Sequence, residues 1–381
     1  MNPALTKTIS LLLIIGIGML FRNKIRNKDQ REGIKTIILS LALPATIFIA
    51  LLQIDFSMDM VLVPVLVFFF NVTLFILVDR LPLQVLFNIP DDRYRTLVML
   101  IPSLAPGLSC LPFIMEYSGQ EPLAMAALGD VGNKIFVLAI LYVIAMKWFY
   151  RNNQQVVPTG KSRLKNLLFT MINEPVNLVI VVAIVMLGFG LNYGSFPEAI
   201  SLSIDRISLM MTPLVLLFIG FSVRLTLEQV KTIFSFLCFR SGIAFFLSAL
   251  LLAVLPVTNP AMMLLIIVFP QSACSFWPYA HMSAVGQLEK QLATGTRGRT
   301  FDLDFAMNVL ACSLPFSVLI ILTIFSVGQP VANVSAVLIA GAAFLAMGVL
   351  VVLLTSKIAT AFKSGTVEMK IVEAREGGDP R

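Results

Sequence analysis

Long apolar stretches alternate with short polar or proline-containing links along almost the whole chain, from Leu5 to Leu354. A helix that crosses a bilayer needs about 20 mostly apolar residues, and stretches of that length recur with no soluble domain of useful size between them. The pattern predicts an all-α polytopic membrane protein. Its eleven expected spans lie near residues 4–22, 34–53, 59–78, 96–116, 121–148, 174–193, 199–223, 233–255, 259–283, 301–327 and 331–355.

Composition supports a membrane environment, because 58% of the 381 residues are apolar and only 13% are charged, about half the usual share for a soluble domain. All four cysteines lie inside apolar stretches without a CxxC pair, which indicates neither a disulfide framework nor a zinc site. The net charge of +7 comes from basic residues dispersed among loops. Nucleic-acid binding, which needs such residues gathered on one face, is therefore not expected.

The distribution of lysine and arginine predicts the orientation, since short basic loops stay cytoplasmic. Basic residues follow spans one, three, five, seven and nine, whereas the intervening loops carry acidic side chains such as Asp55 and Glu198. The first span precedes its basic cluster, so it reads as a retained helix and not as a cleavable signal peptide. We expect an integral protein of the plasma or bacterial inner membrane, with the N-terminus outside and the C-terminus in the cytoplasm.

The two halves of the chain show self-similarity. Three pairs of residues keep offsets of 169, 168 and 167 positions: Pro44 with Pro213, Pro102 with Pro270, and Gly119 with Gly286. Asn133 and Asn308 match at 175 positions, which an insertion at 293–300 accounts for. Because each copy holds five spans, the second enters the membrane from the opposite side, so the repeat is predicted to be inverted. The expected domains are repeat one (1–150), a cytoplasmic linker (151–172), repeat two (173–328), an extra helix (329–356) and a cytoplasmic polar tail (357–381).

Spans four and nine each contain a cluster of helix-breaking residues, three prolines with a glycine in 101–112 and two prolines in 270–278. A proline inside a helix costs about 3 kcal/mol, and the freed backbone groups need protein, water or ligand partners at that depth. Two half-helix N-termini that face each other favour a carboxylate. Simple kinks remain the alternative. The candidate substrate-binding residues are Pro106, Gly107, Ser109, Cys110, Gln271, Ser272 and Ser275.

Charged residues inside span five form a second group of candidates. Asp130 and Lys134, four positions apart, share a helical face on which they can pair. An unpaired charge in the hydrocarbon costs roughly 2.5–3.5 kcal/mol on insertion scales, which favours a role in the bundle interior, although structural pairing alone is an open alternative. Asp302 is interpreted as a solvated helix start, His281 as an interfacial side chain rather than a proton relay, and Arg206 and Arg240 as snorkelling residues without assigned function. The candidate coupling or core polar residues are Asp130, Asn133, Lys134, Asp304 and Asn308.

These motifs together resemble the auxin efflux carrier family of permeases, which is related to PIN-type exporters. The resemblance covers roughly residues 5–327 and rests on Gly16–Arg26, Leu41–Leu51, Gly107–Pro112, Gly119 and Asn133. It implies a ten-helix transporter fold with crossed fourth and ninth spans, a panel and a mobile core, and small organic anions as substrates. This chain departs from the family in having Ala105-Pro106-Gly107 where asparagine is common, the Asp130 and Lys134 pair, and an eleventh span.

Three other functions are alternatives to secondary transport of an organic anion. A sodium-coupled carrier of the bile-acid symporter type shares the inverted five-span plan, and a membrane receptor without transport is the other alternative. An intramembrane aspartyl protease is not indicated, because Gly129-Asp130 lacks the Gly-x-Gly-Asp pattern and no Tyr-Asp occurs; a single histidine cannot build a zinc site. We therefore expect neither an enzyme, a bound metal nor a cofactor. Coupling to H+ or Na+, the substrate, the transport direction and the oligomeric state, a homodimer included, are left open.

Overall fold

The computed structural model describes residues 3–25, 27–53, 58–81, 84, 89–152, 175–222, 227–291 and 299–351. Regular structure in these ranges is helical, with no strand. The prediction of an all-α polytopic membrane protein is confirmed. Most of the predicted linker (153–172) and the whole predicted tail (357–381) lie outside the described residues.

The first half of the chain runs from α1 to α10, and its spans follow the predicted apolar stretches. Residues 28–52 form one continuous span in which a π-helical turn joins α2 to α3, and a second such turn joins α9 to α10. The elements are α1 (Pro3–Phe21), α2 (Lys28–Ile37), η1 (Ile38–Ala42), α3 (Leu43–Leu52), η2 (Met58–Val61), α4 (Leu62–Arg80), α6 (Asp91–Leu100), α7 (Pro106–Ser109), α8 (Leu111–Ser118), α9 (Gln120–Ile135), η3 (Phe136–Ile140) and α10 (Leu141–Asn152).

The second half contains the remaining spans and ends, within the described part, on a helix that covers residues 334–351. The elements are α12 (Pro175–Gly188), η4 (Tyr193–Ser195), α13 (Glu198–Leu209), α14 (Met211–Ser222), α15 (Leu227–Val254), α16 (Pro260–Val268), η5 (Phe269–Gln271), α17 (Trp277–Gln291), α18 (Leu303–Val327) and η6 (Gln329–Val331).

Seven of the described helical segments are long and apolar enough to cross a membrane. Three shorter apolar helices, 8–21, 175–188 and 260–271, fall where spans one, six and nine were predicted. Span four is divided among α6, α7 and α8. The large apolar side chains exposed along these helices, such as Phe69 on α4 and Ile339 on the last helix, are those expected to face lipid.

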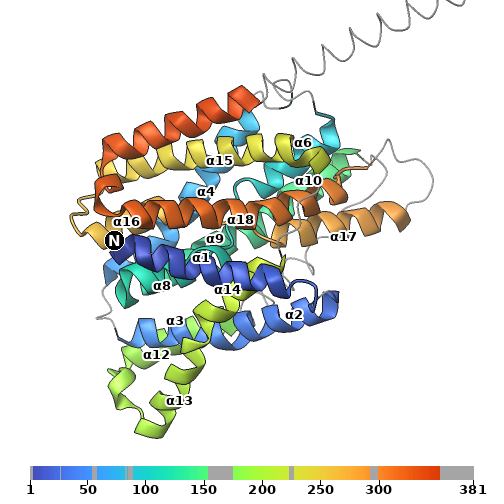
Figure 1. The fold of residues 1–381 in the computed structure, drawn as a ribbon. Coiled ribbons are helices and arrows are strands. Elements are labelled where there is room, and N and C mark those ends of the chain that lie inside the picture. The colour runs from blue at the N-terminus through green and yellow to red at the C-terminus, as the bar shows by residue number, and fades with distance from the viewer. Residues whose placement is uncertain are drawn as a thin grey trace, which may run out of the picture.

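The helices divide into two groups. One group, called the panel here, consists of α1, α2, α3, α12, α13 and α14, which pack on one another in the lower half of Figure 1. The other group, the core, contains α4, α6 to α10 and α15 to α18; α4, α6, α10, α15 and α18 lie in the upper half of Figure 1, whereas α8 lies at the level of α14. The last helix packs on α15, where the Ser235 hydroxyl donates to the Gly348 carbonyl.

Glycines allow two helix pairs to touch along their backbones. A Cβ atom at Gly18 of α1 would lie 2.6 Å from the Leu217 carbonyl oxygen of α14, and one at Gly220 would overlap the Ile15 carbonyl. In the core, a Cβ at Gly132 of α9 would overlap the carbonyl of Pro64 on α4. Only glycine fits at these positions, because any larger residue would force the helices apart.

Candidate functional site

Both predicted helix breaks are present in the structure. Residues 101–105 separate α6 from α7, and 272–276 separate the turn η5 from α17. The helices are interrupted largely because of Pro102, Pro106 and Pro270, since a proline has no N–H to donate and its ring clashes with the preceding turn. Spans four and nine are therefore interrupted, not merely kinked.

The two breaks are hydrogen-bonded to each other. The Ala105 N–H donates to the Ala273 carbonyl at 2.8 Å. Side chains add two further bonds, from the Ala273 N–H to the Ser109 Oγ at 2.9 Å and from the Ser275 N–H to the Ser103 Oγ at 3.0 Å. Backbone groups that leave a helix inside a membrane must be satisfied by protein or ligand, and here each break satisfies part of the other.

Asn133 of α9 holds the first break in place. Its side-chain amide accepts from the Leu104 N–H at 3.1 Å and donates to the Leu104 carbonyl at 2.9 Å. The amide thus replaces the backbone hydrogen bonds that Leu104 would make in a continuous helix. Two further bonds fix the amide itself, from the Asn71 Nδ2 at 3.0 Å and to the Asp130 Oδ1 at 2.9 Å. Asn133, Asn71 and Asp130 take part through their side chains, and Leu104 through its backbone. Asn133 is only 2% exposed.

Arg240 of α15 binds both breaks at once. Its guanidinium donates to the carbonyls of Ile101 at 2.9 Å and Ser103 at 3.3 Å in the first break, and of Ser272 at 2.6 Å in the second. The residue is 1% exposed, and no carboxylate in the described ranges lies within ion-pairing distance of it. The snorkelling interpretation of Arg240 was wrong, because the side chain points into the bundle, where broken backbone offers carbonyl acceptors.

The predicted ion pair of span five is confirmed. The Lys134 ammonium lies 3.1 Å from the Asp130 carboxylate, and both residues are 6% exposed. Lys134 also donates to the Asn177 Oδ1 at 3.1 Å. Because Asn177 belongs to α12, this bond links the core to the panel.

The candidate binding residues of span four lie at or beside the crossing. Ser109 bonds across it, as described above, and the Cys110 thiol lies 3.8 Å from the Val268 carbonyl of α16. Gly107 faces the panel, since a Cβ there would lie 3.1 Å from the nearest side-chain atom of Leu43 on α3. Pro106 is buried at the start of α7. The structure therefore gathers these four residues at one place.

The candidates of span nine complete the same region. The Ser272 hydroxyl donates to the Phe269 carbonyl at 2.6 Å, while Ser275 contributes its backbone N–H to the crossing. Gln271 donates to the Ser241 carbonyl at 3.3 Å. The Gln271 Oε1 and the Ser241 Oγ are buried without a hydrogen-bond partner, which leaves unused hydrogen-bonding capacity next to Arg240.

Asp302 is not the solvated helix start that the sequence suggested. It is 2% exposed, caps α18 by accepting from the Phe305 N–H at 3.1 Å, and binds Arg93 and Arg299 at 3.0 Å each. Burial raises the pKa of this carboxyl, but the hydrogen bonds from Phe305 and Arg93 and the two nearby positive charges outweigh burial and hold the pKa below its ordinary value. Asp302 thus ties α6 to the beginning of α18.

Three other polar residues differ from expectation or remain apart from the crossing. Asp304, predicted to be a core polar residue, is exposed at the start of α18, and Asn308 is half-buried one turn further on. His281, predicted at an interface, is 4% exposed, with its Nε2 3.1 Å from the Val137 carbonyl and its ring 5.5 Å from that of Tyr142. The interfacial interpretation of His281 was wrong, since α17 turns this face towards α10.

Sequence reasoning missed Arg240 and Asn71 as parts of the site. A signal was available, since both are polar residues in apolar spans and stand 169 positions apart, the same offset as Pro44 and Pro213. Both are also hydrogen-bonded at the first break. Arg240 donates directly to the Ile101 carbonyl, and Asn71 donates to Asn133, which holds this break. A search for paired polar residues at the repeat offset would have found them.

Comparison with known proteins finds a similarity to a transporter. No family model matches the chain. A stretch of 202 residues, 52% of the chain, is 22% identical to the uncharacterized transporter MJ1031 of Methanocaldococcus jannaschii, of which the match spans 61%. With the apolar helices and the buried crossing, this similarity makes the chain a transporter-like integral membrane protein.

Proposed function

We propose that the protein is a secondary transporter that moves a small organic anion across the membrane by alternating access. The observation that carries this proposal is the buried crossing of two broken spans, where Arg240 donates to carbonyls of both breaks. Broken helices that meet near mid-membrane are a common site for substrate in secondary transporters. The resemblance to the auxin efflux carrier family and the transporter-named relative agree with it.

Arg240 favours an anionic substrate. A guanidinium stays charged in proteins, and placing a charge in the interior costs several kcal/mol unless good partners compensate for it. Carbonyl dipoles supply part of that compensation here, but no carboxylate of the described residues does. A substrate carboxylate at the crossing would supply the missing negative charge. Ser272, Ser275 and Gln271, which lie at the same crossing, would then orient the anion through hydrogen bonds.

Alternating access would require the core and panel to move relative to each other. Gly107 lies against Leu43 of the panel, and Lys134 binds Asn177 across the same boundary. Such a motion breaks the bond between Lys134 and Asn177 and changes the surroundings of Asp130. Asp130 is thus the carboxylate best placed to couple transport to a proton, and the inverted repeat would give the two access states similar geometry.

The test is counterflow in proteoliposomes with a panel of labelled mono- and dicarboxylates. Arg240→Gln should reduce anion transport by at least about tenfold, as expected when a charged hydrogen-bonded partner is removed, and Arg240→Lys should retain part of it. Arg206→Gln is the matched control, because Arg206 is exposed on α13. Unchanged apparent affinity in Arg240→Gln would refute the assignment. Replacing Na+ by K+ tests the alternative of a sodium-coupled carrier, which requires Na+.

A further inference from the structure

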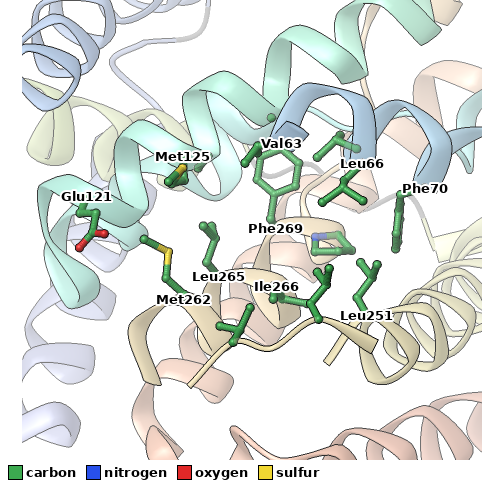
Figure 2. A pocket seen from close by; sticks show the side chains of 16 residues that line it. Val63, Leu66, Phe70, Glu121, Met125, Leu251, Met262, Leu265, Ile266 and Phe269 are labelled. Carbon is green, nitrogen blue, oxygen red and sulfur yellow. The ribbon is translucent and has the colours of Figure 1, made fainter. Parts of the chain in front are cut away.

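An apolar cavity lies in the core, beside the elements that form the crossing. It has a volume of about 370 Å³ and lies between α4 and α9 on one side and α15 and α16 on the other. Figure 2 shows Val63 and Leu66 of α4 facing Leu251 of α15 and Leu265 of α16 across the space. Phe269, at the start of η5, closes one part of it.

The lining is apolar except at one end. Glu121, in the first turn of α9, is the one lining residue with a charged side chain, and Figure 2 shows it beside Met125 and Met262 at the edge of the cavity. An apolar cavity of about 150 Å³ stays dry and binds benzene, and empty space deprives its walls of dispersion contacts. An apolar cavity of this larger volume therefore has room for an apolar group larger than benzene.

The cavity borders the lipid-facing surface of the protein. It is partly open, and large apolar side chains next to its lining positions are exposed: Phe69 on α4 is 60% exposed, and Leu250 on α15 is 58% exposed. In a membrane protein these side chains lie among acyl chains. Glu121 lies in the first turn of α9, at the end of span five that the basic loops predict to be outside, where the headgroups are expected.

We propose that this cavity binds one acyl chain of a membrane lipid whose headgroup carries an ammonium, which pairs with Glu121. The apolar walls select the chain and the carboxylate selects the sign of the headgroup, since an anionic headgroup would be repelled there. The lipid would touch two elements of the crossing, because Gly129 directly precedes Asp130 and Pro270 directly precedes Gln271. The site does not depend on the proposed transport function.

Native mass spectrometry of the full-length protein can measure the binding of phosphatidylethanolamine and phosphatidylglycerol. We expect one tightly bound phosphatidylethanolamine, with an affinity about fivefold above that of phosphatidylglycerol, which corresponds to roughly 1 kcal/mol for a surface ion pair. Glu121→Gln should abolish the preference but keep binding. Leu251→Trp, which fills the cavity, should weaken binding at least about tenfold, whereas the exposed neighbour Leu250→Trp should not. Equal binding by both tryptophan variants would overturn the proposal.

A second measurement on the unmodified protein covers the case in which Leu251→Trp fails to fold. A phosphatidylethanolamine with a photoreactive group in its acyl chain should label peptides that contain Val63–Phe70 and Met262–Phe269 after illumination. Labelling elsewhere alone would refute the lipid site. Competitive loss of label on addition of a transported carboxylate would also overturn it, because the cavity would then belong to the substrate path.

Discussion

Replacing Asn133 by alanine removes the amide that holds the first break, with its bonds to Leu104, Asn71 and Asp130. Leu104 is 1% exposed, so water cannot replace the amide at its N–H and carbonyl. Each buried group left unsatisfied costs about 1–3 kcal/mol. The loss at Leu104 alone is thus about 2–6 kcal/mol, a large part of the 5–15 kcal/mol that typically separates folded from unfolded protein.

Thermal unfolding in detergent, followed by intrinsic fluorescence, measures this loss as a fall in melting temperature. Asn259→Ala is the matched control, because the Asn259 side chain also accepts from a backbone N–H, that of Ala261 at 2.9 Å, but at the exposed start of α16. Loss of such a cap costs only about 0.5–2 kcal/mol. Asn133→Ala should therefore melt well below Asn259→Ala and should also lose transport.

Equal melting temperatures for the two variants would refute the reasoning. They would mean that Leu104 finds other partners once the amide is gone, for instance water that enters the crossing. A variant that melts low but transports normally would separate stability from function and would remove Asn133 from the site.

Three further predictions concern charge, space and pH. Asp130→Asn should destabilise the protein by about 3–5 kcal/mol because it leaves the buried Lys134 ammonium without the carboxylate that balances its charge, whereas adding Lys134→Met should restore most of the loss; thermal unfolding of the single and double variants checks this, and equal losses would contradict it. Gly107→Leu should abolish counterflow while Gly107→Ala retains part of it, since the larger side chain must displace Leu43 at the panel; normal flux in the leucine variant would place the moving boundary elsewhere. Because the folded pKa of Asp302 is lowered, the advantage of wild type over Asp302→Asn should be complete above the ordinary value of 3.8 and fall as the pH decreases through the folded pKa; a pH-independent difference in melting temperature would contradict this.

Hydrophobic length and proline content sufficed to predict the helical spans and their interruptions. The breaks at 101–105 and 272–276 fall inside the stretches that the prolines marked. This part of the fold depends on local chemistry, since chain length, apolarity and the missing proline N–H act within a few residues. The inverted repeat and the membrane orientation stay predictions; cysteine labelling near Lys28 and Glu198 would test the orientation.

The partners of the polar residues could not be predicted in the same way. Arg240 binds carbonyls as many as 139 positions away, and which side of a helix faces them depends on its rotation in the packed bundle. For the same reason the sequence pattern predicted a solvated Asp302 and a core Asp304. The structure shows the opposite, because it buries Asp302 and exposes Asp304. The pair of Asp130 and Lys134 was predictable, because both residues lie on one helix at a fixed spacing.

The glycines that join the helix pairs have a consequence for reading relatives of this chain. Gly18 and Gly220 in the panel and Gly132 in the core have no room for a side chain, although none of them bonds the crossing. Alignments of close relatives should therefore find these glycines as invariant as Asn133 and Arg240. Ranking positions by invariance alone would mix residues retained for their lack of volume with residues retained for their polarity. The two sets can be distinguished by the substitution that is not tolerated at each invariant position. At the glycines this is alanine, and at the polar residues it is a change of the polar group.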